Sequence, residues 1–114
     1  MKKLSVLVLL VMPFALQYCS STKKASKAEE PKLTYAANIQ PLMVANCSPC
    51  HFPPRGNKKA YDNYLAVKTD VDSILTRIHK NPGEKGFMPF KKAKLSDSTI
   101  NVFVQWKKDG LLEK

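Results

Sequence analysis

The chain is poor in cysteine, histidine and acidic residues. Its 114 residues include two histidines and three cysteines. Three cysteines are too few for the dense disulfide framework of a small secreted scaffold. Nine acidic residues stand against 19 basic ones, so the formal net charge is +10. The sequence also lacks an internal repeat, a phosphate-binding loop, a catalytic triad and any clear period-two β-pattern. These absences argue against a disulfide scaffold, a phosphate-loop enzyme and a triad hydrolase.

Residues 1–18 have the layout of a secretory signal peptide. Two lysines precede an apolar run from Leu4 to Leu16, which is short for a membrane span. The segment therefore predicts export. It also resembles a bacterial lipoprotein signal, in which Cys19, three residues after Leu16, would be lipidated and become the new N-terminus. An uncleaved signal anchor and ordinary cleavage nearby are the alternatives.

Residues 19–32 predict a flexible tether between this signal and the folded domain. After Cys19 they are mostly Ser, Lys, Ala and Glu in no regular period, with no large apolar residue to bury. The domain is therefore predicted over residues 33–114. A domain of this size usually draws part of its stability from a metal, a disulfide or a cofactor.

The pentapeptide CSPCH, Cys47 to His51, carries the clearest chemistry. A structural zinc site usually takes two separated pairs of ligands, but His51 directly follows Cys50 and does not easily share its tetrahedron. A thiol-disulfide oxidoreductase places C-x-x-C after a β-strand at a helix N-terminus, whereas the preceding segment here is helix-like. Haem attachment needs all three residues, because two thiols join the two vinyl groups and the adjacent imidazole binds the iron.

With this motif the chain resembles a class I cytochrome c of the small bacterial type. The segment GFMPF supports the resemblance, because Met88 is followed by Pro89 in a loop between two helix-like segments. The family implies one covalent haem c on Cys47 and Cys50, with His51 and Met88 as the axial ligands of the iron. It also implies an all-α fold of three to four helices wrapped around the haem.

Three helices are predicted from periodicity and capping. The first runs from a cap at Asn38 to Cys47. The second begins at Thr69, shows an apolar stripe at i, i+3, i+4 and i+7, and ends before Pro82. The third begins at Ser96 and closes at Gly110. A short helical turn is also expected within AYDNYLAV, with Tyr61, Tyr64 and Leu65 available to face the haem.

Several further residues receive roles. His79 is a rival ligand to Met88, although its place near a helix end favours a capping or exposed role. In the family a proline carbonyl orients the ligand imidazole, which makes Pro53 and Pro54 the candidates. Phe87 and Phe90 are expected to wall the haem edge. By resemblance Trp106 or Phe103 fills the contact between the first and last helices.

The function implied is one-electron transfer in an exported redox chain, and not enzymatic catalysis, because two axial ligands leave the iron no open position. The alternatives are a thiol-disulfide oxidoreductase using Cys47 and Cys50, and a haem sensor or peroxidase with a labile Met88. Lysines at 85, 91, 92 and 94 flank the Met88 loop and predict acidic docking partners, or solubility alone. Nucleic acid is not an expected partner. The expected location is the periplasmic or outer-surface side of a membrane, with anchorage through Cys19.

Overall fold

The computed structural model describes residues 30–114. The predicted signal peptide at 1–18, the lipidation site Cys19 and most of the tether lie outside the described residues. Within the described part no helix is both long and apolar enough to cross a bilayer.

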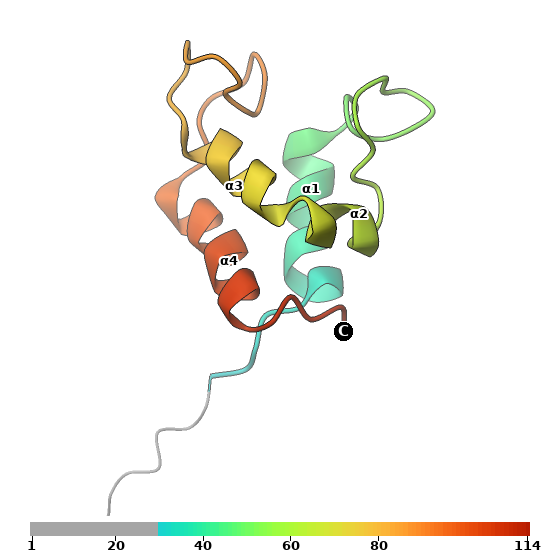
Figure 1. Ribbon diagram of the computed structural model, residues 1–114, viewed down its shortest axis with the longest axis vertical. Coiled ribbons are helices and arrows are strands. Elements are labelled where there is room, and N and C mark those ends of the chain that lie inside the picture. The colour runs from blue at the N-terminus through green and yellow to red at the C-terminus, as the bar shows by residue number, and fades with distance from the viewer. Residues whose placement is uncertain (1–29) are drawn as a thin grey trace, which may run out of the picture.

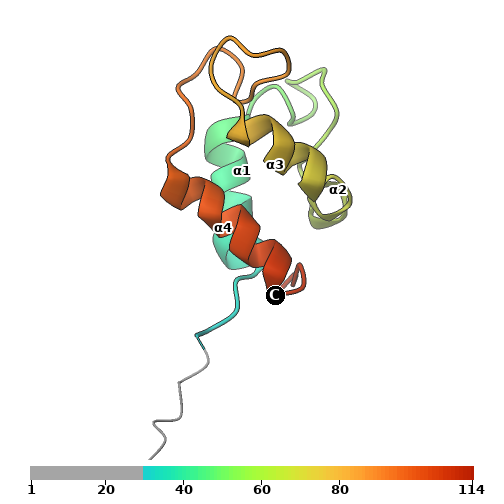
Figure 2. The ribbon, with the colours of Figure 1, turned by 60° about the vertical axis from the view of Figure 1, so that its left-hand side comes forward.

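The described residues form an all-α domain, which confirms that part of the prediction. A π-helical turn, η1, spans Tyr35–Ile39, and four α-helices follow: α1 Gln40–Cys47, α2 Tyr64–Thr69, α3 Val71–His79 and α4 Asp97–Lys108. From residue 30 onward the only β-type pairing is an isolated bridge between Thr34 and Leu112. Two long loops, 48–63 and 80–96, lie at one end of the domain, where α1 also ends (Figures 1 and 2).

The first helical segment begins earlier than predicted. Thr34 caps η1, because its hydroxyl accepts a hydrogen bond from the Ala37 N–H at 3.3 Å. The predicted cap, Asn38, lies inside η1 and its side-chain oxygen accepts from the Thr34 N–H at 2.9 Å. The expectation that Asn38 begins the helix was therefore wrong. Pro41 lies in the first turn of α1, where its missing N–H leaves no hydrogen bond unmade.

The middle of the chain contains two short helices, and the helical turn expected within AYDNYLAV is the beginning of α2. Thr69 was expected to cap the second helix, but it is the last residue of α2, and Asp70 separates α2 from α3. Asn63 caps α2 by accepting from the Ala66 N–H at 3.0 Å. The apolar stripe of α3 is confirmed, since Val71, Ile74 and Ile78 are buried.

Helix α4 follows its prediction closely. The Ser96 hydroxyl accepts from the Thr99 N–H at 3.2 Å, and Asp97 lies in the first turn. The helix ends at Lys108, and Gly110 adopts a φ of 97°, which glycine tolerates better than other residues.

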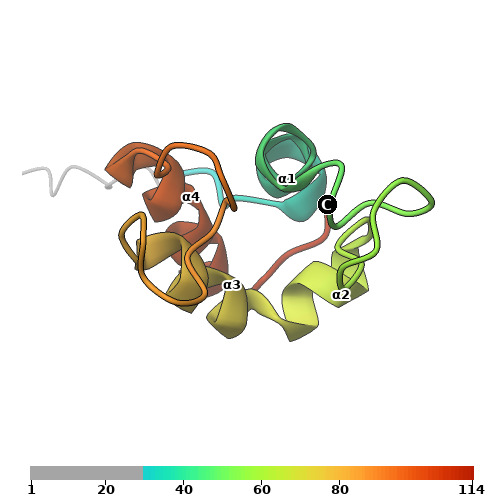
Figure 3. The ribbon, with the colours of Figure 1, turned by 90° about the horizontal axis from the view of Figure 1, so that it is seen from above.

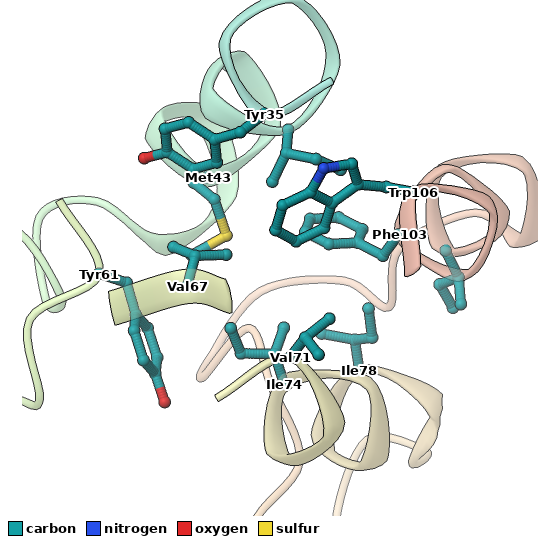
Figure 4. Packing of buried hydrophobic residues seen from close by; sticks show 11 residues of the cluster. Tyr35, Met43, Tyr61, Val67, Val71, Ile74, Ile78, Phe103 and Trp106 are labelled. Atoms are coloured by element: carbon teal, nitrogen blue, oxygen red, sulfur yellow. The ribbon is translucent and has the colours of Figure 1, made fainter. Parts of the chain in front are cut away.

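The core lies between α1, α3 and α4 and is closed on one side by α2 (Figure 3). Side chains from all four helices point toward a common centre in Figure 4, where Trp106 and Phe103 meet Met43 and the α3 stripe. Trp106 is fully buried, and its ring centroid lies 6.2 Å from that of Tyr35 in η1. The expected aromatic contact between the first and last helical segments is thus present.

Hydrogen bonds join the beginning and the end of the domain. The Leu33 N–H donates to the Asp109 carboxylate at 2.7 Å, and the Tyr35 N–H donates to the Leu112 carbonyl at 2.8 Å. The Trp106 indole N–H donates to the same Leu112 carbonyl at 2.8 Å. The first and last residues of the folded domain therefore meet at the end opposite the two long loops (Figure 1).

Candidate functional site

A cavity of about 630 Å³ contains all four predicted site residues in its lining, namely Cys47, Cys50, His51 and Met88. Three of them come from the end of α1 and the turn after it, and Met88 comes from the second long loop. Apolar side chains of α3 and α4 form much of the wall, including Ile74, Ile78 and Phe103. The cavity therefore joins the CSPCH motif to a distant methionine across an apolar interior.

The two cysteines have different surroundings. Cys47 is the last residue of α1, half-buried, and its Sγ lies 3.8 Å from Met43 Sδ. Burial raises the pKa of the Cys47 thiol to about 11, although Lys92 nearby lowers it in part. Cys50 lies in the following turn and is exposed. Both thiols are free, so they are available for covalent chemistry.

His51 is held by its backbone and by its ring. Its N–H donates to the Cys47 carbonyl at 3.1 Å, and its Nδ1 lies 2.6 Å from the Lys59 carbonyl oxygen. This contact assigns the proton to Nδ1 and leaves Nε2 with a lone pair that can bind a metal. The expectation that Pro53 or Pro54 supplies the orienting carbonyl was wrong, because the loop returns to the histidine only at Lys59.

Gly56 makes this return possible. A Cβ atom at position 56 would lie 2.2 Å from the carbonyl oxygens of both Pro49 and Cys50, so only glycine fits there. The Gly56 N–H donates to the Phe52 carbonyl at 3.0 Å, and the Lys58 N–H donates to the Cys50 carbonyl at 3.1 Å. The loop is thereby folded back onto the motif.

Met88 is placed by α3. Its backbone N–H donates to the Arg77 carbonyl at 3.2 Å, near the end of that helix, and the side chain is half-buried in the cavity lining. Phe90 also lines the cavity and remains 64% exposed, as expected for a residue at its edge. Phe87 was expected beside it, but this side chain is buried and is not part of the lining.

His79 lies apart from the cavity. Its ring is exposed, and Nδ1 lies 2.8 Å from the Leu75 carbonyl oxygen one turn back in α3. It is not among the lining residues. The capping and exposed role that was favoured for His79 is confirmed.

Of the three residues expected near the haem from AYDNYLAV, only Tyr61 lines the cavity. The Tyr64 hydroxyl instead donates to the Leu111 carbonyl at 2.9 Å, and Leu65 is 67% exposed. Tyr61 stacks on the His51 ring with 4.8 Å between the ring centroids and 20° between the planes. Tyr61 therefore belongs to the site, whereas Tyr64 and Leu65 do not.

Other lining residues were not predicted as part of the site: Asp70 and Arg77 were not singled out from the sequence, and Lys92 was assigned only to docking or solubility. Asp70, at the junction of α2 and α3, forms an ion pair with Lys59 and lines the cavity. Arg77 of α3 also lines it. Lys92 places its Nζ 3.5 Å from each of three carbonyl oxygens at the end of α1, those of Ala45, Asn46 and Ser48. No local pattern marks Asp70 or Lys92, because their partners are distant in the sequence.

No protein-family model matches the chain significantly, and no curated protein and no solved structure matches it significantly either. Among residues 30–114, no group of three or more His, Cys, Asp and Glu side chains is arranged to hold a metal ion.

Proposed function

We propose that this protein is a monohaem c-type cytochrome that carries single electrons. The observation that carries the proposal is that Cys47, Cys50, His51 and Met88 all line one cavity with apolar walls. The motif alone occurs in unrelated proteins, and Met88 lies far from it in the sequence. The fold nevertheless brings Met88 to the cavity of the C-x-x-C-H motif. Methionine is one of the side chains that bind the haem iron in c-type cytochromes.

The cavity suits a haem in its size and in the chemistry of its lining. Its volume of about 630 Å³ is within the roughly 300–1,000 Å³ range of cofactor pockets. Ile74, Ile78 and Phe103 offer apolar contact to a flat ring, while Lys59 and Arg77 offer cations to its carboxylates. Two free thiols and an imidazole Nε2 with a lone pair complete the set.

A bound haem supplies a one-electron couple at its iron. Cys47 and Cys50 would hold the group covalently, and His51 and Met88 would bind its iron. With both side chains on the iron, no coordination position would remain for oxygen, peroxide or substrate, so we propose a carrier and not an enzyme. A thioether ligand favours a higher reduction potential than a second imidazole, and the apolar part of the lining would support the same effect.

The arrangement around Cys47 disfavours a thiol-disulfide oxidoreductase. Such enzymes lower the pKa of the nucleophilic thiol at a helix N-terminus. Here Cys47 is at the C-terminal end of α1, where the helix dipole opposes a thiolate, and burial raises the pKa of its thiol to about 11. A sensor or peroxidase requires Met88 to leave the iron, and no contact of the described residues favours that alternative.

The first experiment asks whether haem is covalently attached. The exported protein, made in cells with a haem-attachment system, should retain haem after denaturation and should gain the mass of one haem. Cys47→Ala with Cys50→Ala should lose both properties. Free, alkylatable thiols in the wild-type protein, with no added mass, would refute the proposal.

The second experiment tests the axial ligand. Met88→Ala should keep the covalent haem but lower the reduction potential and open the iron to cyanide or CO. His79→Ala is the matched control and should change neither, since its ring is bonded at the surface of α3. The sulfur-to-iron charge-transfer band of the ferric protein should vanish only in Met88→Ala. The reverse pattern would mean ligation by two histidines.

We further propose that the exported domain is held at a membrane surface by acylation of Cys19. One acyl chain binds a bilayer only marginally, so stable anchorage requires more than one on the same residue. Fractionation of Cys19→Ser tests this point. The variant should appear in the soluble fraction, and unchanged membrane association would exclude lipidation as the anchor.

A further inference from the structure

Three residues outside the predicted ligand set, Lys59, Tyr61 and Asp70, form a ring of contacts that begins and ends at His51. The Lys59 carbonyl oxygen lies 2.6 Å from His51 Nδ1, and the Lys59 ammonium pairs with the Asp70 carboxylate. The same carboxylate accepts a hydrogen bond from the Tyr61 hydroxyl at 2.8 Å. The Tyr61 ring stacks on the imidazole, and the backbone N–H of Tyr61 donates to the His51 carbonyl at 2.9 Å.

Asp70 is the fixed point of this chain of contacts. It joins two helices, since its N–H donates to the Ala66 carbonyl at 3.3 Å and its own carbonyl accepts from the Ile74 N–H at 2.9 Å. Its side chain is only 17% exposed. Hydrogen bonds from Lys59 and Tyr61 lower the pKa of its carboxyl group, so the group is an anion at neutral pH. Lys59 and Tyr61, by contrast, belong to a loop with no helix of its own.

We propose that Asp70 is a positioning residue, which fixes the imidazole of His51 through Lys59 and Tyr61 and thereby sets its strength as a ligand. The inference rests on the proposed haem function for its redox consequence, but the contacts themselves belong to the chain without cofactor. A hydrogen bond at Nδ1 increases electron donation from Nε2, and its geometry depends on where the Lys59 carbonyl is held. Loss of the Asp70 anchor lets that carbonyl move away.

Two of three substitutions separate the effect of charge on the reduction potential from the effect of positioning. Asp70→Asn removes a negative charge near the site and loosens the anchor, and both effects should raise the reduction potential. Lys59→Met removes a positive charge, which by charge alone should lower the potential, whereas loosening the carbonyl should raise it. Tyr61→Phe changes no charge and keeps the ring, so any rise comes from the lost hydroxyl contact with Asp70.

Asp72→Asn is the matched control for Asp70→Asn. Asp72 lies in the first turn of α3, two residues after Asp70, and also pairs with a lysine, Lys107, but its side chain is 76% exposed and does not line the cavity. The two variants change the net charge equally. Asp72 is the more solvent-exposed of the two and does not line the cavity, so its charge should shift the potential less and Asp72→Asn measures only the general effect of losing one negative charge. Lys59→Met and Tyr61→Phe are the variants that separate positioning from charge.

The experiment combines a redox titration with nuclear magnetic resonance of the cofactor-free protein. We expect the potential to rise in Asp70→Asn, Lys59→Met and Tyr61→Phe, and to stay near the wild-type value in Asp72→Asn. In the cofactor-free protein the His51 Nδ1–H signal should exchange faster with solvent in the first three variants only. A lowered potential in Lys59→Met, or equal shifts in Asp70→Asn and Asp72→Asn, would overturn the inference.

The two readouts separate this inference from the proposed function. If the wild-type protein holds no haem, the redox measurement is void and the proposed function fails. The exchange of the His51 ring proton in the cofactor-free protein then still decides whether Asp70 positions the imidazole. If Asp70→Asn does not fold, Lys59→Met and Tyr61→Phe give the answer, because Lys59 is exposed and Tyr61→Phe preserves the ring.

Discussion

At the scale of single residues, the unequal surroundings of the two motif cysteines predict unequal reactivity. The thiolate is the form that alkylating reagents attack, and a pKa of about 11 leaves Cys47 almost wholly protonated at pH 8. In the cofactor-free protein Cys50, which is exposed, should be alkylated at least roughly tenfold faster than Cys47. Peptide mapping by mass spectrometry during a time course with iodoacetamide measures both rates. In denaturant the two rates should converge, and equal rates in the folded protein would contradict the environment described for Cys47.

Gly56 predicts the clearest single-residue damage to the site. In Gly56→Ala the new methyl group would meet the carbonyl oxygens of Pro49 and Cys50 at 2.2 Å, so the loop must open. We expect a loss of about 1–3 kcal/mol of unfolding free energy, the usual cost of overpacking. If the protein carries haem as proposed, attachment should also be poor. Urea unfolding and the yield of covalent haem measure the two effects. Asn57→Ala, next to it in the same loop and exposed, should change neither quantity.

At the scale of secondary structure, α4 shows what a local signal can specify. Ser96 was predicted to begin this helix, and its hydroxyl does accept from the Thr99 N–H. Helix caps involve residues only two or three apart, so the sequence alone can reveal them. The same reasoning failed at Thr69, where the start of one helix coincided with the end of another. It failed at Asn38 because Thr34 offers an earlier cap to η1.

The cap of α4 can be tested directly. Ser96→Ala removes the acceptor for the Thr99 N–H and should destabilise the protein by about 1 kcal/mol. Ser96→Asp keeps an acceptor and adds a negative charge at the helix N-terminus, so it should retain the wild-type stability. The midpoint of urea unfolding gives the comparison. Equal losses in the two variants would show that the cap is not what stabilises this end.

At the scale of the whole molecule, the contact between Leu33 and Asp109 joins the two ends of the domain and makes its stability depend on pH. Hydrogen bonds from the Leu33 N–H and the Gln105 side chain lower the pKa of the Asp109 carboxyl group below its ordinary value of 3.8. A group with a lowered pKa in the folded state stabilises it above its unfolded pKa, and this contribution is lost as the pH falls through the folded value. The contribution should therefore be complete at pH 6 and should decline below about pH 4.

Comparison with Asp109→Asn isolates this contribution from that of other carboxyl groups. Asparagine has nearly the same shape but does not ionise in this range. The wild-type protein should be more stable than the variant at pH 6, and the difference should shrink as the pH falls toward 3. Urea midpoints at successive pH values measure it. A difference that is constant with pH would mean that the charge of Asp109 contributes nothing.

The lysines around the Met88 loop predict behaviour toward redox partners at the same scale. The Lys91 ammonium lies 5.3 Å from the centre of the exposed Phe90 ring, and Phe90 lines the cavity. If these charges steer the protein to acidic partners, electron transfer should slow as salt rises, because exposed charges act within about 8 Å at physiological ionic strength. Lys85→Glu with Lys91→Glu should slow it further at low salt. Stopped-flow mixing with an acidic acceptor tests both points, and a flat response to salt would leave the lysines a role in solubility alone.

Lys92 is omitted from that charge reversal for a structural reason. Its ammonium faces three carbonyl oxygens at the end of α1, where it offsets the negative end of the helix dipole. A glutamate there would disturb the helix that holds Cys47, so a slower rate would not report on steering. The remaining lysines lack this contact and therefore test charge more cleanly.

Features made by residues close together in the sequence could be predicted without the structure. The CSPCH stretch, the apolar stripe of α3 and the cap of α4 are each defined by residues within a few positions of one another. Such patterns can be recognised without knowledge of the fold, because helix periodicity and ligand spacing are short-range properties. They were enough to predict helices and to single out Cys47, Cys50 and His51, and the family resemblance added Met88 and the all-α fold.

Only the tertiary structure decided which distant groups meet at the site. It placed Met88 in the lining of the cavity that holds the motif, moved the orienting carbonyl from the prolines to Lys59, and brought Asp70 to the Lys59 side chain. Lys59 lies eight residues beyond His51, and the turn at Gly56 and the packing of α3 fix the path between them. Contacts of this kind depend on how helices and loops pack together, and no short-range pattern in a sequence contains that information.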